Sequence, residues 1–368
     1  MARIPLSKTT KFIVDNRGRT APTANSGIPL IATNCIDNKN LYPVYENIRY
    51  VSKETYETWF RSHPQPNDII ITLKGSQNGA VCLVPNPVDF AIAQDMVALR
   101  ADENAINPLF LFAALRSEDV QHQIKNLDVS GVIPHFKKGD FDKLLIPYPD
   151  KDLQKTIGDT YFNFSKKIDL LQRQNKTLGK LAETLFRQWF VEEAAKSWEI
   201  RKLDDFFPII TGKRDANYGS EDGIYPFFTC SQKILKCDYY SYEGHAILLA
   251  GNGDFNLKRY KGRFEAYQRT YVLIPSDEKY VGFLFYLMKY FLNEMTSGAQ
   301  GSVISFLTKG MIAQFEFRFP RVVPEAELKE LNIINEHIDC NAAQIRTLTQ
   351  LRDALLPKLM SGEVRVNQ

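Results

Sequence analysis

Cysteine is scarce in this chain, which has five cysteines among 368 residues and no Cys-x-x-Cys pair. An odd number at irregular spacing is a poor basis for a disulfide framework, so we expect reduced thiols and a cytoplasmic location. The first residues, MARIPLSKTTKFIV, do not follow the pattern of a secretory signal. The most apolar stretch, Val281 to Leu292, contains Lys289 and is shorter than the about twenty residues that cross a membrane. It predicts a buried helix and no membrane partner.

Catalytic motifs are also missing. No Gly-x-x-x-x-Gly-Lys-Ser/Thr loop occurs, and Gly251-Asn252-Gly253 does not continue into a dinucleotide-binding fingerprint. The sequence has no Asn-Pro-Pro-Tyr or Asp-Pro-Pro-Tyr segment, with which amino-methyltransferases hold a flipped base, and its five histidines lack metal-ligand spacing. Glu327-Leu328-Lys329 has the Glu-x-Lys shape of some nucleases, but its acidic neighbours lie on the same predicted helix. We therefore predict a binding protein without a catalytic residue, metal or cofactor of its own.

Charge of one sign is not in large excess. The formal net charge is +3, so any nucleic-acid-binding surface must be a local patch. The hydrophobic fraction of 44% and the charged fraction of 24% are ordinary for a soluble globular protein. At roughly 150 residues per domain, the length predicts two or three domains.

The sequence does contain an internal repeat. Shifted by about 170 residues, VSGVIPHFKKGDFDKLLIPYP (129–149) lies over GSVISFLTKGMIAQFEFRFP (301–320), and PLFLFAALR (108–116) lies over VGFLFYLMK (281–289). Nearer the start of each copy the offset grows to about 195, where GIPLIATN (27–34) parallels GIYPFFTC (223–230). Because the matches keep their order along the chain, we infer two related globules whose early loops differ in length.

Each copy ends in a helical pattern whose apolar residues alternate spacings of four and three. Such alternation over more than three turns is typical of a coiled-coil seam, in which a polar Asn can fix the register. The alternative is that each helix packs only on its own globule, but the shared frame favours packing of the helices on each other. The two seams are Phe164, Ile168, Leu171, Asn175, Leu178, Ala182, Leu185 and Trp189, and Ile334, Ile338, Asn341, Ile345, Leu348, Arg352, Leu355 and Leu359.

The globules have the pattern of mixed α/β domains. DIIITL (68–73) and AILLA (246–250) are predicted to form matching buried strands, and TYVLIP (270–275) a further strand before the apolar helix. The expected fold class is therefore α/β, with two related globular domains separated by two long helices in a pseudo-twofold repeat. The predicted domains are residues 1–149, the first helix 150–196, the second globule 197–323 and the second helix 324–368.

Cations, amides and aromatics gather in matched loops. NLKRYKGRF (256–264) is expected to form a charged loop at a strand edge, suited to phosphate contact, with TLKGSQNGA (72–80) as its equivalent. Gln and Asn can pair with adenine, and Lys or Arg with guanine. NRGRTAPT (16–23) and TGKRDANY (211–218) form a second matched pair. A solvated charge run and an ordinary β-turn are the alternatives. The candidate DNA-binding residues are Arg17, Arg19, Lys74, Ser76, Gln77, Asn78, Lys213, Arg214, Asn217, Tyr218, Asn252, Lys258, Arg259, Tyr260, Lys261 and Arg263.

The length of the seams suggests the form of the DNA site. From Phe164 to Trp189 a helix measures about 39 Å at ~1.5 Å per residue. One turn of DNA is about 34–36 Å, so helices of this length would hold two readers roughly one turn apart. Because the loops differ between copies, we expect a bipartite and asymmetric site with an unread spacer set by the helices.

LRDALLPKLMSGEVRV (351–366), its partial echo LAETLFRQWF (181–190) and the Lys-Gly segments before each helix resemble the specificity (S) subunit of type I restriction-modification systems. The resemblance covers essentially the whole chain. It implies two target-recognition domains that each read half of a split site on double-stranded DNA, and an antiparallel coiled coil that docks two methyltransferase (M) subunits. It also implies that adenine methylation and restriction belong to the M and the restriction/translocase (R) subunits, which carry S-adenosylmethionine, ATP and Mg. Arg187-Gln188 stands where the tail pattern has Pro-Lys, so the two M contacts need not be equivalent.

Two other classes of protein are alternatives to a DNA-specificity subunit. A nuclease or methyltransferase would need motifs that are missing, and a coiled-coil scaffold would bind protein only. The salt dependence of DNA binding distinguishes the scaffold from the specificity subunit. Log affinity for DNA falls steeply with log salt concentration when several phosphates are contacted, and a scaffold would show no such slope.

Overall fold

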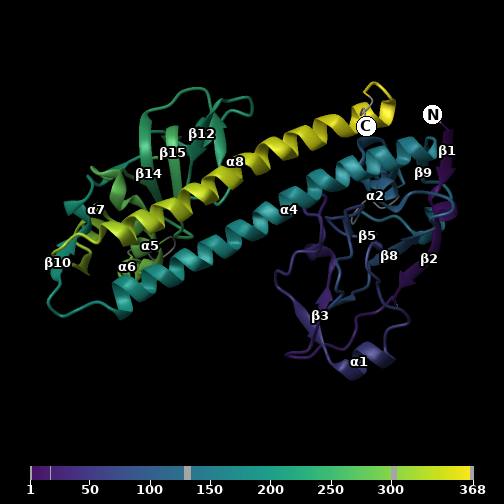
Figure 1. The fold of residues 1–368 in the computed structure, drawn as a ribbon, viewed down its shortest axis with the longest axis horizontal. Coiled ribbons are helices and arrows are strands. Elements are labelled where there is room, and N and C mark those ends of the chain that lie inside the picture. The colour runs from purple at the N-terminus through teal and green to yellow at the C-terminus, as the bar shows by residue number, and fades with distance from the viewer. Residues whose placement is uncertain (1, 17, 128–133, 300–304, 365–368) are drawn as a thin grey trace. The chain divides into compact units, whose positions relative to one another are not determined.

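The computed structural model describes residues 2–16, 18–127, 134–299 and 305–364. It divides into two compact units, unit 1 (1–172 and 343–368) and unit 2 (173–342). Each unit contains one globule and a half of each of two helices of 37 residues, α4 (Lys151–Arg187) and α8 (Glu325–Ser361) (Figure 1). The two long predicted helices are therefore confirmed, whereas the limits of the predicted domains stay predictions.

The globule of unit 1 is built on two small sheets with the strand orders β2-β8-β5-β6 and β4-β3-β7. All four residues of β5 are buried, as expected for DIIITL, because α2 packs on one face of its sheet and strands of the second sheet lie against the other. The elements are β1 (Ala2–Pro5), β2 (Thr10–Asp15), β3 (Ile28–Ile31), β4 (Arg49–Val51), α1 (Lys53–Thr58), β5 (Ile69–Thr72), β6 (Val81–Leu83), β7 (Ala91–Ile92), β8 (Met96–Ala101), α2 (Pro108–Arg116), α3 (Glu118–Asn126) and β9 (Leu145–Tyr148).

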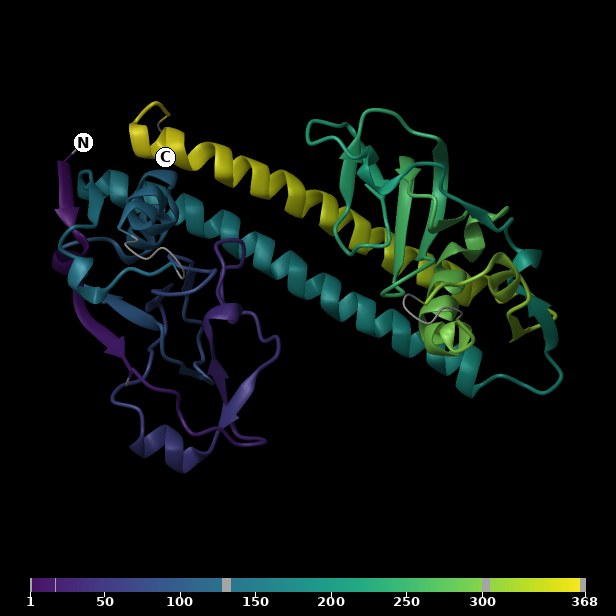
Figure 2. The same ribbon diagram turned by 180° about the vertical axis from the view of Figure 1, so that it is seen from behind.

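The globule of unit 2 has one six-stranded sheet of order β11-β16-β14-β15-β12-β13. Its strands lie beside α8 in both views (Figures 1 and 2). The apolar helix expected from Val281 is α5, and seven of its residues are buried, so the buried-helix prediction is confirmed. The elements are β10 (Glu199–Lys202), β11 (Ile210–Thr211), β12 (Tyr225–Phe228), β13 (Leu235–Cys237), β14 (Tyr242–Ala250), β15 (Leu257–Ala266), β16 (Thr270–Leu273), α5 (Val281–Tyr290), α6 (Leu292–Thr296), α7 (Lys309–Ala313) and β17 (Glu316–Phe319).

The two globules share one strand order, which confirms the internal repeat. The neighbours β2-β8-β5-β6 of unit 1 correspond to β11-β16-β14-β15 of unit 2, and β3 and β4 correspond to β12 and β13. The long strand β15 pairs with β14 and, in parallel, with β12. It takes the place of two strands in unit 1, β6 beside β5 and β7 parallel to β3. Parts of the matched segments before the long helices, at 129–133 and 301–304, lie outside the described residues.

A two-stranded antiparallel ribbon joins the beginning and the end of each globule. In unit 1, β1 pairs with β9 over four residue pairs, from Ala2 opposite Tyr148 to Pro5 opposite Leu145. In unit 2, β10 pairs with β17 over four residue pairs in the same way. Each long helix therefore starts within a few residues of the strand that closes its globule.

Within each unit, a segment of α4 and a segment of α8 contribute to the same packing. In unit 1 the guanidinium carbon of Arg352 lies 5.5 Å from the ring centroid of Tyr161. In unit 2 the Asn341 Nδ2 donates to the Asn175 Oδ1 at 2.8 Å, and the Asn175 Nδ2 donates to the Ile338 carbonyl at 3.1 Å. The two seam asparagines thus bond to each other, and none of the sixteen predicted seam residues is exposed. The interlocking of side chains that defines a coiled coil stays a prediction.

A glycine of α4 lets α2 approach closely. A Cβ atom at Gly158 would lie 2.5 Å from the Phe110 backbone nitrogen and 2.9 Å from the Leu109 carbonyl carbon. Asn107 caps the start of α2 by accepting a hydrogen bond from the Phe110 N–H at 2.9 Å. The start of α2 is therefore in direct backbone contact with α4, at a position where only glycine fits.

Candidate nucleic-acid interface

The loop after β5 presents polar side chains on a glycine framework. Gly75 and Gly79 have φ angles of +96° and +82°, a region in which other residues are strained. Lys74 and Ser76, like the neighbouring Gln77, are exposed, and Asn78 is half-buried. The Asn78 Oδ1 is buried and accepts no hydrogen bond from the described residues. The loop therefore has the shape expected from TLKGSQNGA.

The loop after β14 is its equivalent in unit 2. Both loops are fixed by the same three backbone hydrogen bonds. One joins the loop to the turn before the neighbouring strand of the sheet, β8 or β16, and two join it to a later segment, 134–136 or 305–307. In unit 1 these are Leu73 N to Asp95 O (2.8 Å), Gly75 N to Pro134 O (2.9 Å) and Phe136 N to Leu73 O (3.1 Å); in unit 2 they are Gly251 N to Arg269 O (2.8 Å), Gly253 N to Ser305 O (3.1 Å) and Leu307 N to Gly251 O (2.9 Å). Lys74 and Asn252 consequently occupy equivalent positions.

The prediction that 256–264 forms a charged loop is wrong. Residues Leu257–Ala266 are strand β15, which pairs with β14 from Leu249 opposite Leu257 to Tyr242 opposite Phe264. The physical reason is that side chains alternate between the two faces of a strand. Tyr260 and Phe264 pack into one apolar cluster, while Lys261 and Arg263, which lie between them, are on the other face. The loop 72–80 therefore corresponds to the residues between β14 and β15, and not to 256–264.

Most cations of β15 already have carboxylate partners. Arg259, whose side chain is 6% exposed, donates to Asp339 of α8 at 2.6 and 2.9 Å. Lys261 pairs with Glu278 at 2.7 Å, and Arg263 pairs with Glu243 at 3.2 Å. These pairs hold the sheet together and connect it to α8, so their charges are largely neutralised within unit 2.

Lys258 and Tyr260 lie on the opposite face of β15. Lys258 donates to the side chain of Asn256 at 2.5 Å and to the Thr229 carbonyl at 3.4 Å. Burial lowers its pKa. The ring of Tyr260 lies 5.4 Å from that of Phe228. Both side chains are half-buried and take part in the packing of the sheet.

The cations of the matched loops 16–23 and 211–218 differ in whether they form an ion pair. Arg17 lies outside the described residues, and Arg19 is exposed. Lys213 is exposed and lies over the ring of Tyr242, with 5.7 Å between its Nζ and the centroid. Arg214 pairs with the fully buried Glu265 at 3.2 Å and covers the ring of Tyr218. Among the described residues, no ion pair is formed by Arg19, Lys74 or Lys213.

Equivalent hollows lie beside these loops in the two globules. The hollow of unit 1 has a volume of about 270 Å³ and is lined by Lys74, Gln94 and Asp95 among others. The hollow of unit 2 has a volume of about 320 Å³ and is lined by Gly251, Gln268 and Arg269 among others. Gln94, Asp95, Gln268 and Arg269 are not among the residues predicted from the sequence, although AQDMVAL (93–99) and YQRTYVL (267–273) align on the shared glutamine.

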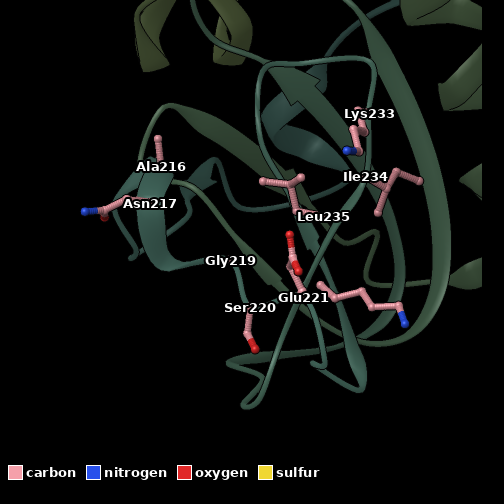
Figure 3. Close-up of a pocket in the computed structure, with 9 residues that line it drawn as sticks. Ala216, Asn217, Gly219, Ser220, Glu221, Lys233, Ile234 and Leu235 are labelled. Atoms are coloured by element: carbon pink, nitrogen blue, oxygen red, sulfur yellow. The ribbon is translucent and has the colours of Figure 1, made fainter. Parts of the chain in front are cut away.

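Asn217 lines a separate hollow of unit 2 with a volume of about 500 Å³. It comes from a short 3-10 turn, Ala216–Tyr218, whereas Lys233 and Ile234 come from the loop between β12 and β13 and Leu235 is the first residue of β13 (Figure 3). The structure therefore does not bring the predicted residues into one site. Lys74 lines the hollow of unit 1 described above, whereas Ser76 and Asn78 line another hollow of that unit, of about 330 Å³. Others lie on strand β15, and Asn217 lines this separate hollow of unit 2.

The buried imidazole of His245 is expected to make the stability of unit 2 depend on pH. His245 is 8% exposed, and burial followed by the charges of Arg259 and Lys261 lowers its pKa to about 4. An unfolded chain binds this proton near pH 6.5. The free energy of unfolding should therefore be maximal with respect to this group above pH 6.5 and fall as the pH decreases toward 4. We expect His245→Gln to lose less stability than the parent between pH 7 and pH 5 in urea unfolding; equal losses would contradict this assignment.

In the part of the chain that the structure describes, no cluster of three His, Cys, Asp or Glu side chains is placed to bind a metal ion. The same residues include no helix with both the length and the apolar character of a membrane span.

Similar proteins identify the architecture. A family model for the type I restriction modification DNA specificity domain matches this chain twice, at residues 20–180 and 195–350. The EcoDI type I restriction enzyme specificity subunit of Escherichia coli is 34% identical over 172 residues, which are 45% of this chain but only 38% of that protein. The MjaIX type I specificity subunit of Methanocaldococcus jannaschii is 24% identical over 309 residues, covering 70% of this chain and 69% of that protein.

A solved structure has the same fold. The type I restriction-modification system S subunit from M. genitalium superimposes with a TM-score of 0.66 at 18% sequence identity, covering 97% of this chain and 95% of that one. At this identity the likeness concerns the fold, which is the α/β fold with two related globules expected from the sequence. Since the family model matches both globules and most of their length, this chain belongs to the type I restriction modification DNA specificity family, with two copies of its domain.

Proposed function

We propose that this protein is the non-catalytic DNA-specificity subunit of a type I restriction-modification complex. One observation carries the proposal: two globules with the same strand order and the same loop framework present different side chains in equivalent hollows. A repeated framework with different linings suits a protein that reads two different halves of one DNA site. The family supports the same function.

The proposed partners follow from this function. Double-stranded DNA would be bound in the cytoplasm, and two M subunits would dock on α4 and α8, with R subunits joining through the complex. Leu170 and Leu181 of α4 and Leu351 of α8 support the docking, because they are 51%, 45% and 46% exposed on helices whose seam residues are covered. S-adenosylmethionine, ATP and Mg would bind to these partners, and no cofactor is proposed for this chain.

We propose that DNA phosphates are bound by the exposed cations of the predicted loops that have no carboxylate partner. Arg19, Lys74 and Lys213 have this property among the described residues, whereas Arg259, Lys261 and Arg263 are paired within unit 2. Ser76, Gln77 and Asn78 remain candidates for contact with bases or sugars, because their loop borders a hollow. A lysine that must break its ion pair with a carboxylate before it binds a phosphate gains less binding free energy than an unpaired lysine does.

Lysine substitutions test this assignment through salt dependence. Each phosphate contact contributes about −0.9 to the slope of log affinity against log salt. We expect the double variant Lys74→Ala, Lys213→Ala to bind duplex DNA with a slope smaller in magnitude by about 1.8. Fluorescence anisotropy between roughly 50 and 200 mM salt, with the chain in complex with its M partner, measures the slope.

The matched control is Lys261→Ala, which removes one lysine that is bound to Glu278. An unchanged slope is expected for this control. If Lys261→Ala lowers the slope and the double variant does not, β15 contacts DNA and the loop assignment is wrong. A parent complex whose affinity does not depend on salt would contradict the proposed DNA-binding function itself.

A further inference from the structure

The two equivalent hollows share a glutamine that is fixed in the same way. Gln94 Nε2 donates to Thr20 Oγ1 at 3.1 Å, and Gln268 Nε2 donates to Asp215 Oδ1 at 3.0 Å. Thr20 and Asp215 each follow the arginine that the repeat aligns, so the same cross-link between two loops occurs in both units. The glutamine, together with the backbone hydrogen bonds of the loop, defines a common framework for the two hollows.

The residue after this glutamine has opposite charge in the two units. Asp95 and Arg269 are equivalent, because their carbonyls accept hydrogen bonds from the equivalent backbone nitrogens of Leu73 and Gly251, both at 2.8 Å. Both side chains are exposed, and both residues line their hollows. Neither forms an ion pair with any described residue, in contrast to the cations of β15.

Charge restricts what each of these side chains can contact on DNA. A carboxylate beside a duplex is repelled by phosphates, so Asp95 is compatible with DNA only where it faces a base edge. The favourable partner of a carboxylate there is the N4 amino group of cytosine, whereas arginine donates two hydrogen bonds to N7 and O6 of guanine. The exposed Lys74 and Lys137 line the same hollow as Asp95 and can bind the flanking phosphates.

Resting on the proposed function, we infer that Asp95 and Arg269 are specificity-determining residues at equivalent places in the two half-sites. Asp95 selects a cytosine in one half, and Arg269 selects a guanine in the other. The shared glutamine and backbone framework hold the two residues in the same position relative to the DNA. The asymmetry of the bipartite site thus arises in part from one pair of equivalent residues with opposite charge.

Two conservative substitutions test the inference. Asp95→Asn removes the charge but keeps a residue that tolerates the φ of +68° at this turn. Asparagine and glutamine both pair with adenine, so Asp95→Asn should admit adenine in place of cytosine and Arg269→Gln should admit adenine in place of guanine. Each variant is expected to change one position in one half-site only, with discrimination altered on the order of 10-fold. Methylome sequencing of cells that express the chain with its M partner measures both motifs.

The matched control is Glu103→Gln, which removes an exposed carboxylate beyond the other end of β8 and should leave the motif unchanged; Glu103 forms no ion pair with a described residue. Unchanged motifs for both Asp95→Asn and Arg269→Gln, or changes by both in the same half-site, overturn the inference and leave the proposed function intact. If a variant methylates no site, binding of its purified complex to duplexes carrying each base in turn decides; equal weakening for every base overturns the inference. A parent that methylates no bipartite motif would instead contradict the proposed function.

Discussion

Removal of seven residues from each long helix is expected to redirect methylation to sites whose halves lie about three base pairs closer together. Seven residues are two helical turns and about 10.5 Å of helix, against ~3.4 Å per base pair. The segments 166–172 of α4 and 344–350 of α8 suit the deletion. In both helices they lie between the residues of the Tyr161–Arg352 contact and those of the Asn175–Asn341 contact, so that both contacts are kept. Methylome sequencing of cells that also express the M partner gives the length of the gap.

The deletion preserves the seam because seven residues are one full repeat of the four-and-three spacing, so the seam residues on either side stay in phase. Three base pairs also turn the DNA by about 100°, so we expect weaker methylation at the new sites than the parent gives at its own. Deletion of 166–172 alone is the control, since it removes residues from one helix without matching the other, and it should abolish methylation at bipartite sites. A double deletion that still methylates the parental motif with its original gap would show that the helices do not set the spacing.

Gly158→Ala is expected to destabilise unit 1 by about 2 kcal/mol, although the same change in an exposed helix stabilises by up to about 1 kcal/mol. The added methyl group would lie 2.5 Å from the Phe110 nitrogen, and the atoms it meets are mainly backbone that cannot rotate away. The start of α2 must therefore move away from α4. Urea unfolding of the purified chain measures the difference in the free energy of unfolding.

Gly179→Ala in the same helix is the matched control. A Cβ atom at Gly179 has no neighbour within 4 Å, so only helix propensity acts and the variant should be more stable than the parent by about 0.5–1 kcal/mol. Gly158→Ala and Gly179→Ala are thus expected to change the free energy of unfolding in opposite directions. Equal stabilisation by both would mean that α2 does not approach α4 at Gly158.

The sequence was sufficient for the features that depend on local pattern. Hydrophobic periodicity predicted both long helices, and the asparagine that interrupts each seam, Asn175 in one and Asn341 in the other, bonds to its counterpart. The buried strand DIIITL and the apolar helix after TYVLIP also follow from short stretches of sequence. The internal repeat was readable because the matched segments keep their order along the chain.

The candidate site was predicted less well, because the state of a charge depends on residues far away in the sequence. Arg259 looks like a phosphate-binding residue until its partner, Asp339, is found on α8, eighty positions later. The alternation of Tyr260 and Phe264 with cations indicates a strand, but the density of charge favoured a loop. Gln94 and Gln268 were missed because a single shared glutamine carries little weight before its repeated hydrogen bond is known.

The ribbons β1–β9 and β10–β17 have a consequence for how such proteins can change. Because each ribbon brings the entry and exit strands of its globule side by side, a whole globule can be exchanged as a cassette with two neighbouring junctions. A graft made at these junctions would carry its own strands and its own hollow and would leave α4 and α8 intact. Its apolar face would have to fit the helix residues that enter the core, such as Ile157 and Leu356 in unit 1. Under the proposed function, one recombination step that exchanges a globule would give the protein a new half-site while the second globule keeps its own.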